Sequence, residues 1–467
     1  MILSIHFLFY FDYRCDIVLK GDRMNPLFIE RMKKLLKNEY EDFANALSQK
    51  QVKALYFNPN KQNLEPLIEK FQLKKHHFVK NGYYFDHERF PLGKHPYHDC
   101  GLYYIQEPSA MIVASLLDVQ KDDYILDMCA APGGKTCYVG SQLRQTGLVI
   151  ANDINATRAS ILSSNVERFG LNNTIVTNTA PGQLTKQLPE YFDKVILDAP
   201  CSGEGMFRKL DQAMETWSLD KVKECAQIQK ELIEQAYVAL KPGGILVYST
   251  CTYAKEENEE VVDHLLALHE DIHLLPIPLQ HGMMPGIDHK ECCRLYPHKH
   301  FGEGHFIALF QKEDNNKKRH RAACVESTIK KDQLVLLKQF YQEHLKIDVP
   351  NCIFDSQQHL YAIKPYFPQL TKVKILRQGL YLGECKKGRF EPGYALSHCL
   401  EQSMVKRYYQ FDAQSKEIQQ YLKGETLEGT GQKGYGVLYV DSYPLAFYKE
   451  NNGIVKNQFP KGLRKQY

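Results

Sequence analysis

Hydrophobic and polar positions change their spacing along the chain, and each change predicts a different kind of element. From Pro26 to about Gln49, apolar residues recur at helical spacing between faces rich in Lys and Glu, which predicts a small helical opening domain. A polar and aromatic segment from Gly93 then leads into a helix that begins after Pro108. Beyond this helix, short apolar runs alternate with longer segments of helical periodicity as far as Gln311.

This alternating part predicts one α/β domain over residues 106–312. Strands are expected over residues 124–128, 147–151, 174–176, 194–197, 245–249, 272–277 and 305–311. Helices are expected over residues 137–143, 156–169, 220–240 and 255–269. Repeated strand–helix units are typical of a mostly parallel, doubly wound, Rossmann-like sheet, which binds its ligand at the carboxyl ends of the strands.

The segments outside this domain differ in composition. The apolar start is too short to span a bilayer and lacks an export cleavage site, so residues 1–23 are interpreted as a possible non-native extension before an N-terminal helical domain over residues 24–105. Residues 313–331 are polar and basic, which predicts a linker. Two small domains are expected beyond it, an α/β domain over residues 332–390 and a Gly- and Tyr-rich one over residues 391–467.

Composition and charge narrow the class of protein. The 467 residues carry a formal charge of only +4, so attraction to a polyanion depends on local basic stretches. One such stretch is the linker, and another is the acid-free closing segment with Lys456, Lys461, Arg464 and Lys465. The 13 cysteines are odd in number and scattered, which favours reduced thiols and a cytoplasmic location.

A metal site has to be considered near the adjacent pair Cys292 and Cys293. His298, His300 and His305 follow closely and would supply further ligands. Adjacent cysteines lack the CxxC spacing of zinc modules, however, and we therefore expect no metal.

A glycine-containing turn joins the first strand of the α/β domain to its helix. Residues 126–136 read LDMCAAPGGKT, in which small residues let backbone N–H groups approach a ligand closely. The turn matches neither the dinucleotide pattern GxGxxG nor the phosphate loop GxxxxGK[ST]. The next strand ends in Asp153, which either caps a helix or accepts hydrogen bonds from ribose hydroxyls. Together these features predict an adenosine-containing ligand.

Two cysteines follow predicted strand ends. Cys201 comes after Asp198 and Pro200, and Cys251 comes after Ser249 and Thr250. If the two strands are neighbours, about 4.8 Å apart, both thiols open into one crevice within about 10 Å of each other. The alternative is a pair of buried, inert thiols. A thiolate at such a position would be a competent nucleophile.

Several longer motifs resemble those of a known family. They read YYIQEPSAM, DMCAAPGGKT, DAPCSGEGMFRK, YSTCT and RLYPHKHFGEGHFIALF. From Met24 to about Lys312 their order is similar to that of RNA cytosine-5 methyltransferases of the Nop/Sun type, closest to the bacterial ribosomal RNA small subunit methyltransferase F (RsmF) group. The closing GIVKNQFPKGLR is similar to the PUA-like domain of that group. The resemblance implies a methyltransferase domain over residues 106–312 and RNA-binding roles for residues 24–105 and 391–467.

The resemblance also implies a cofactor and its site. The cofactor would be S-adenosylmethionine, held by Cys129, Ala130, Ala131, Pro132, Gly133, Gly134, Lys135, Asp153, Arg158 and Asp198. Family members often have an aspartate near the adenine, and Ala180 stands at that position here. Contacts to adenine are therefore expected from backbone and apolar groups.

Four residues correspond to the family's catalytic groups. The resemblance makes Cys251 the nucleophile that adds to carbon 6 of cytosine and Cys201 the thiol that assists release of the enzyme. Asp198 would bond to the cytosine edge, and Lys135 would assist at the base. A paired target base would have to be flipped out, or the target would be single-stranded.

Three hypotheses about the function follow from these observations. The expected substrate is 16S ribosomal RNA or the small ribosomal subunit, and transfer RNA is the nearest alternative. A non-catalytic RNA-binding assembly factor is the alternative of another class, but such a scaffold has no need of Lys135, Asp198, Cys201 and Cys251 together. No membrane partner is expected, and the protein is expected to be a monomer.

Overall fold

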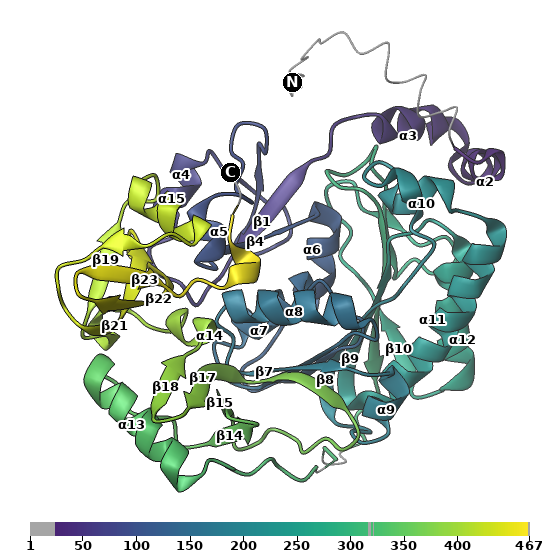
Figure 1. Cartoon of the computed structure of the whole chain (residues 1–467). Coiled ribbons are helices and arrows are strands. Elements are labelled where there is room, and N and C mark those ends of the chain that lie inside the picture. The colour runs from purple at the N-terminus through teal and green to yellow at the C-terminus, as the bar shows by residue number, and fades with distance from the viewer. Residues whose placement is uncertain (1–23, 316–318, 321, 466–467) are drawn as a thin grey trace.

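The computed structural model describes residues 24–315, 319–320 and 322–465, and Figure 1 shows the whole chain. The possible extension over residues 1–23 lies outside the described residues. Among the described residues, no helix is long and apolar enough to cross a membrane.

The central sheet has ten strands within the described part of the chain, and the five in its middle are parallel. In spatial order these are β9 (Leu240–Thr250), β8 (Phe192–Asp198), β5 (Tyr124–Asp127), β6 (Leu148–Asn152) and β7 (Thr174–Asn178). Antiparallel strands flank them: β13 (His305–Lys312), β12 (Cys293–Leu295), β11 (Met284–Pro285) and β10 (Ile272–Leu275) beyond β9, and β16 (Lys374–Gln378) beyond β7. The predicted α/β sheet is confirmed, although antiparallel strands form both of its flanks.

Helices cover both faces of this sheet. One face packs against α6 (Pro108–Ser115), α7 (Gly134–Gln142) and α8 (Ala156–Arg168). The other face packs against α9 (Pro181–Thr185), α11 (Leu219–Ala239) and α12 (Glu259–Leu268). Along β5, Ile125 joins the first core and Leu126 the second, because successive strand side chains point to opposite faces. Because helices cover both faces of the sheet, the sequences of these strands are continuous apolar runs without alternation.

Two predicted boundaries are wrong. The strand predicted from residue 245 already begins at Leu240, as β9, and its register with β8 shifts between Phe192 and Lys194. The helix predicted from residue 255 begins at Glu259, after a 3-10 turn over Lys255–Glu257. In both cases the departure is local and leaves the order of elements unchanged.

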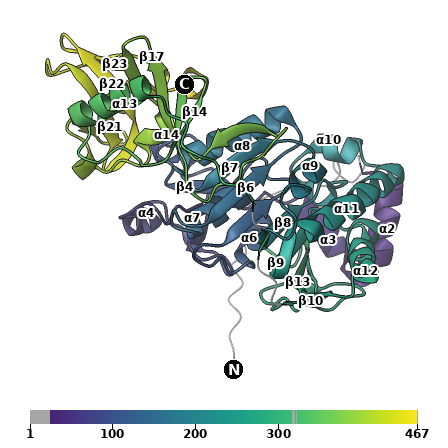
Figure 2. The same cartoon turned by 90° about the horizontal axis from the view of Figure 1, so that it is seen from below.

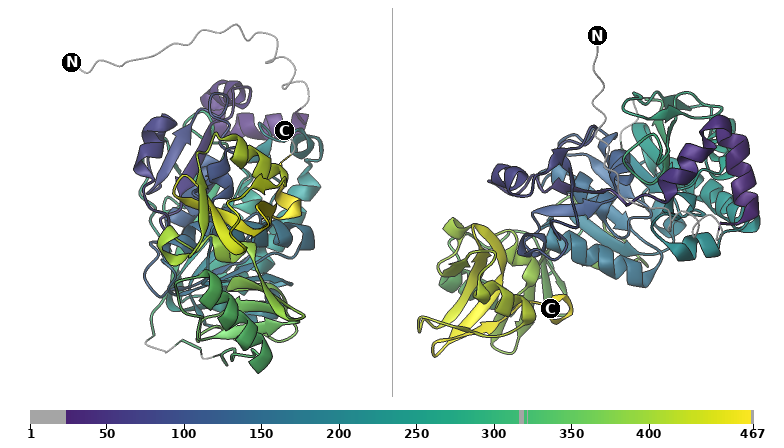
Figure 3. Two further views of the ribbon diagram at one scale, coloured as in Figure 1. Left: turned by 60° about the vertical axis from the view of Figure 1, so that its left-hand side comes forward. Right: turned by 90° about the horizontal axis from the view of Figure 1, so that it is seen from above.

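The opening segment is not a helical domain of its own. The helices α2 (Pro26–Leu36) and α3 (Tyr40–Leu47) are present, but they pack on the central domain. The ring of Phe28 lies 4.8 Å from that of Phe207 and 5.6 Å from that of Trp217, measured between centroids. Figures 2 and 3 show these helices at the opposite end of the molecule from the C-terminal strands.

The rest of residues 24–105 forms a sheet, which corrects the prediction of a helical domain. Its order is β2-β3-β1-β4, with β1 (Lys53–Phe57), β2 (Lys74–Lys75), β3 (Gly82–Phe85) and β4 (Tyr103–Gln106), joined by α4 (Glu65–Lys70) and α5 (Pro96–Asp99). These strands are two to five residues long, too short for alternation to stand out in the sequence.

Two further sheets form the C-terminal part. The first has the order β14-β15-β17-β18, with α13 (Lys331–His344), β14 (Ile353–Ser356), β15 (His359–Ala362), β17 (Leu380–Lys386), β18 (Arg389–Pro392) and α14 (Tyr394–Ser397). The second has the order β19-β21-β22-β23-β20, with β19 (Tyr408–Phe411), α15 (Lys416–Lys423), β20 (Leu427–Glu428), β21 (Gly434–Val440), β22 (Tyr443–Asn451) and β23 (Ile454–Asn457). The predicted domain over residues 332–390 is not self-contained, because β16 within it pairs with β7 of the central sheet.

The two ends of the chain share one hydrophobic core. Leu55, Phe57 and Tyr103 of the N-terminal sheet pack in the same cluster as Leu438 and Tyr443. The N-terminal sheet and the last domain are therefore one packed body.

Two cations expected to attract RNA are engaged within the fold. In the predicted linker, the Arg319 guanidinium lies 3.8 Å from the centroid of the Tyr124 ring and pairs with Asp193. In the closing segment, Lys465 Nζ lies 2.5 Å from Asp99 Oδ2. These two side chains stabilise contacts between segments, which weakens the expectation that they bind phosphates.

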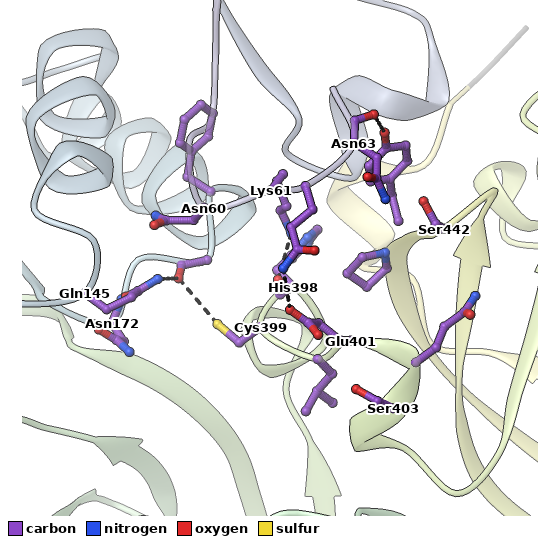
Figure 4. A pocket seen from close by; sticks show the side chains of 17 residues that line it. Asn60, Lys61, Asn63, Gln145, Asn172, His398, Cys399, Glu401, Ser403 and Ser442 are labelled. Carbon is purple, nitrogen blue, oxygen red and sulfur yellow. Dashed lines mark hydrogen bonds between the residues drawn. The ribbon is translucent and has the colours of Figure 1, made fainter. Parts of the chain in front are cut away.

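A cavity of about 500 Å³ lies where the three parts of the chain meet (Figure 4). Asn60 and Lys61 reach it from the loop after β1, Asn172 from the central domain and Cys399 from the loop after α14. Lys61 Nζ donates a hydrogen bond of 2.8 Å to the carbonyl oxygen of His398, and this contact fastens the first part to the last.

A buried ion pair ties α12 to β12. Arg294 Nε lies 2.7 Å from Glu259 Oε1, and Arg294 Nη2 lies 2.5 Å from Glu259 Oε2. The side chains of Arg294 and Glu259 are 3% and 0% exposed, so neither has water as a substitute partner.

Replacing Arg294 should destabilise the protein strongly. We expect Arg294→Ala to lower the free energy of unfolding by about 3–5 kcal/mol, because the Glu259 carboxylate remains buried without its partner. The matched control is Lys50→Ala, which breaks an exposed ion pair with Glu88 and should change stability little. Urea unfolding of both variants measures the difference, and equal midpoints would contradict the expectation.

Candidate active site

A cavity of about 310 Å³ opens at the carboxyl ends of β5, β8 and β9. Eight of the sequence-predicted site residues line it, namely Cys129, Ala130, Ala131, Pro132, Gly134, Lys135, Asp198 and Cys251. Gly133, Asp153, Arg158 and Cys201 do not line it. The predicted turn and the predicted nucleophile therefore meet in one crevice.

Glycines allow the turn between β5 and α7 to run close to its neighbours. Gly133 has a φ of 110°, in the left-handed region that a side chain would strain. A Cβ on Gly134 would lie 2.8 Å from the side chain of Gln106 on β4. Tyr56 of β1 donates a hydrogen bond of 2.7 Å to the carbonyl oxygen of Gly134. The N-terminal sheet therefore supports the turn directly.

Asp127, the last residue of β5, is a site residue that was not predicted. It lines the cavity and is fully buried. Its Oδ2 accepts a hydrogen bond of 2.6 Å from Thr136 Oγ1, whereas its Oδ1 has no partner. Burial raises the pKa of Asp127 to about 7. The sequence feature that could have identified Asp127 as a site residue is its position at the end of a strand, immediately before the turn.

Asp153 and Arg158 support the turn from outside the cavity. Asp153 Oδ2 accepts from the Ala131 N–H at 3.3 Å, and its Oδ1 accepts from the Asn155 N–H at 2.9 Å. Arg158 Nη2 donates to the carbonyl oxygen of Ala131 at 2.7 Å. Asp153 thus supports the turn and the start of α8 through backbone N–H groups, and it lies next to the turn that would hold a ribose.

The two thiols lie in contact. The strands β8 and β9 pair in parallel with Asp198 beside Ser249, as the prediction required. The Sγ atoms of Cys201 and Cys251 are 3.2 Å apart, well within the predicted distance. The contact with Cys251, together with burial, raises the pKa of Cys201 well above its usual range. Cys201 is therefore a protonated thiol at neutral pH.

Buried hydrogen bonds hold the loop that carries Cys201. Glu257 accepts from the Ser202 N–H at 2.9 Å and also from the Ser202 hydroxyl. Gln229 Nε2 donates to the Pro200 carbonyl oxygen and to Glu257 Oε2, both at 2.9 Å. Burial raises the pKa of Glu257 to about 7. This network fixes the sulfur of Cys201 against that of Cys251.

Lys135 and Asp198 form an ion pair beside the thiols. Lys135 Nζ lies 2.6 Å from Asp198 Oδ2, and Ser249 Oγ donates to Asp198 Oδ1 at 2.7 Å. Burial opposes ionisation of Asp198, but Lys135, His305 and the hydrogen bond from Ser249 together outweigh it and lower the pKa of Asp198. Two further cations, Lys53 and Lys209, line the same cavity.

A second buried network was also missed from the sequence. Ser109 Oγ donates to Glu107 Oε2 at 2.5 Å and lies 2.9 Å from His305 Nδ1. Both Glu107 and His305 line the cavity. The sequence had suggested His305 only as a possible metal ligand. Among the described residues, no group of three or more His, Cys, Asp or Glu side chains is arranged to hold a metal ion.

Ala180, where family members have an aspartate, is exposed and precedes α9. Thr179 beside it is buried, and its Oγ1 donates to Gln183 Oε1 at 2.5 Å. Residue 180 therefore offers no side-chain carboxylate that could bind an adenine.

Family models match the chain in four consecutive segments. The model of the 16S rRNA methyltransferase RsmB/F matches residues 114–311, and that of the N-terminal domain of 16S rRNA methyltransferase RsmF matches residues 24–108. The RsmF rRNA methyltransferase first C-terminal domain matches residues 339–400, and the methyltransferase RsmF PUA domain matches residues 408–465.

Whole proteins match as well. The ribosomal RNA small subunit methyltransferase F of Vibrio cholerae is 30% identical over 464 residues, which cover 93% of this chain and 96% of the relative. That of Vibrio vulnificus is 32% identical over 394 residues, covering 81% of this chain and 82% of the relative. A solved structure of a methyltransferase homolog protein from Pyrococcus horikoshii is 31% identical with a TM-score of 0.56, covering 64% of this chain and 100% of that one.

These matches confirm the predicted resemblance over nearly the whole chain. The protein belongs to the RsmF family of 16S rRNA methyltransferases.

Proposed function

We propose that the protein methylates carbon 5 of a cytosine in 16S ribosomal RNA through a covalent adduct between Cys251 and carbon 6. The observation that carries this proposal is the contact between two thiols, 3.2 Å apart, beside the ion pair of Lys135 and Asp198. All four residues adjoin the crevice formed by the cofactor turn. A scaffold that only binds RNA has no use for this arrangement.

The cofactor turn fits the amino-acid end of S-adenosylmethionine. Asp127 Oδ1 is a buried acceptor without a partner, as a cationic amino group requires. The small residues Cys129, Ala130, Ala131 and Gly134 line the cavity beside it and leave room for a ligand. Asp153 would accept from the ribose, and Arg158 would hold the neighbouring part of the turn. S-adenosylmethionine supplies an electrophilic methyl group when bound.

Cys251 starts the reaction at the base. Carbon 5 of cytosine is a poor nucleophile, and addition of the Cys251 thiolate to carbon 6 converts the ring into an enamine that is reactive at carbon 5. The ring nitrogen at the cytosine edge takes up a proton from solvent, which keeps the enamine neutral, and returns it to solvent when the adduct breaks. Asp198, which Lys135 helps to keep ionised, accepts a hydrogen bond from this protonated edge and stabilises it. Lys53 and Lys209 line the cavity and would neutralise phosphates next to a flipped nucleotide.

Cys201 then assists release. After carbon 5 has gained the methyl group, its proton leaves to solvent, and the freed electron pair restores the ring double bond and expels the Cys251 thiolate. Cys201 is protonated and lies 3.2 Å from the departing sulfur, so its S–H stabilises the leaving thiolate by a hydrogen bond. Because both thiols must stay reduced, we place the protein in the cytoplasm.

Incubation with labelled S-adenosylmethionine tests the substrate. Small ribosomal subunits, naked 16S RNA and transfer RNA are offered separately, and label is expected in 5-methylcytosine of the ribosomal RNA. Cys251→Ala should reduce incorporation to background, because the adduct no longer forms. Label confined to transfer RNA would move the substrate to that class, and absence of label from every RNA would contradict the proposal.

The two cysteines should differ in the adducts they leave. We expect Cys201→Ala to accumulate an RNA–protein complex that survives denaturing electrophoresis, because the Cys251 thiolate leaves slowly without its hydrogen-bond donor. The double variant Cys201→Ala/Cys251→Ala is the control and should give no complex. A complex from Cys251→Ala alone would reverse the two roles.

Binding of S-adenosylmethionine should depend on the protonation of Asp127. The pKa of Asp127 is about 7 before binding, and a cationic group binds its ionised form. Affinity should therefore rise about tenfold per pH unit below pH 7 and level off near it. Asp127→Asn should bind more weakly and without this pH dependence, whereas Ser160→Ala, on the exposed side of α8, should behave as the wild type. Calorimetry between about pH 5.5 and 7.5 gives the dissociation constants, and a flat wild-type profile would exclude this role.

A further inference from the structure

His305 lies beside the proposed nucleophile. The strands β9 and β13 pair in antiparallel fashion, with Thr250 opposite Phe306. Cys251 follows Thr250 and His305 precedes Phe306, so the two residues are neighbours at the end of this ladder. The side chains of both line the same cavity. Their arrangement brings an imidazole and a thiol into one confined space.

The hydrogen bonds fix which nitrogen of His305 carries the proton. The hydroxyl of Ser109 has a single proton, which it donates to Glu107 Oε2 at 2.5 Å. Its oxygen, 2.9 Å from His305 Nδ1, must then accept, so Nδ1 carries the hydrogen and Nε2 has the free electron pair. The free pair of Nε2 is what a general base requires.

Glu107 is held firmly at the end of the hydrogen-bond series that runs through Ser109 to His305. Its carboxylate also accepts from the backbone N–H groups of Ser109, Ala110 and Glu303, at 3.0, 2.8 and 2.8 Å. Burial opposes its ionisation, but His305 and these hydrogen bonds outweigh it and lower the pKa of Glu107. Glu107 Oε2 lies 3.7 Å from His305 Nδ1, close enough to balance a positive charge on the ring.

His305 itself is neutral at rest. Burial lowers the pKa of His305, against the opposing effects of Glu107 and Asp198, and Lys135 adds to the lowering. Among the other acidic and thiol groups at this cavity, Asp127 has an oxygen without a partner, which the proposed function assigns to the cofactor. Both oxygens of Asp198 accept hydrogen bonds, and contact with Cys251 keeps the pKa of the Cys201 thiol raised. His305 thus has an available electron pair in the cavity that Cys251 also lines.

We propose that His305 is the general base that removes the proton from the Cys251 thiol; this rests on the proposed role of Cys251 as nucleophile. The S–H bond breaks, its electron pair stays on sulfur, and the proton binds Nε2 of His305. Glu107 balances the resulting imidazolium through Ser109. When the bond between sulfur and carbon 6 later breaks, the thiolate takes this proton back, and His305 is neutral again for the next turnover.

Alkylation of Cys251 by iodoacetamide tests the proposal without RNA or cofactor. The full-length protein is alkylated between about pH 6 and 9.5, and the rate at Cys251 is followed by peptide mass spectrometry. We expect rapid alkylation of the wild type at pH 7. His305→Gln should be slower by about tenfold or more at pH 7 and should approach the wild-type rate near pH 9.5, where thiols ionise without a base.

Two further variants separate a chemical role from a structural one. Ser109→Ala retains the imidazole but removes the group that fixes its tautomer, so its rate at pH 7 should fall between those of the wild type and His305→Gln. His300→Gln replaces another buried histidine, which does not line this cavity, and should alkylate as the wild type does. Methylation by His305→Gln at pH 7 should fall by roughly 100-fold and recover towards pH 9.

The outcomes discriminate clearly. If Cys251 of the wild type is alkylated at pH 7 no faster than an ordinary thiol, this result alone overturns the proposal. A His305→Gln rate that equals the wild type at pH 7, or that stays low at pH 9.5, also overturns it. Alkylation that depends on His305, in a protein that methylates no RNA, supports the base while refuting the proposed function. Methylation by a protein whose alkylation is independent of His305 refutes the base alone.

Discussion

The parallel pairing of β8 with β9 is the constraint on which the site depends. With Asp198 held beside Ser249, the residues that follow the two strands leave the sheet at the same edge, and the sulfurs of Cys201 and Cys251 come into contact. Proline at position 200 ends the first strand, because it cannot extend a ladder. The same edge receives the cofactor turn after β5, since β5 is the other neighbour of β8. One sheet register thus brings the thiols, the ion pair and the turn together.

Exclusion of water gives these groups their chemical character. Burial keeps Asp127 and Glu257 close to half protonated near neutral pH, by raising the pKa of each to about 7. By contrast, Asp198 stays ionised because Lys135 is beside it. Asp127 and Asp198 therefore differ in charge although they are the same residue type and line the same cavity, and the difference comes from their partners and their burial.

The strand ends could be predicted from the sequence because the signal is local. The apolar run before Asp198, the proline after it and the glycines of residues 133–134 each have a direct structural meaning. The contact between Glu107, Ser109 and His305 could not be predicted, since it joins α6 to a strand far along the chain. Two-residue strands such as Lys74–Lys75, and β16 returning to the central sheet, likewise depend on tertiary pairing that no local pattern records.

The core shared by the two ends of the chain has a consequence for synthesis. Leu55, Phe57 and Tyr103 are made early, but the residues that cover them, Leu438 and Tyr443, are made among the last. At bacterial elongation rates this interval is on the order of tens of seconds. During that time the N-terminal sheet has an uncovered apolar face, while the central domain has all of its parallel strands available. The N-terminal sheet can therefore complete its core only after the last strands have emerged.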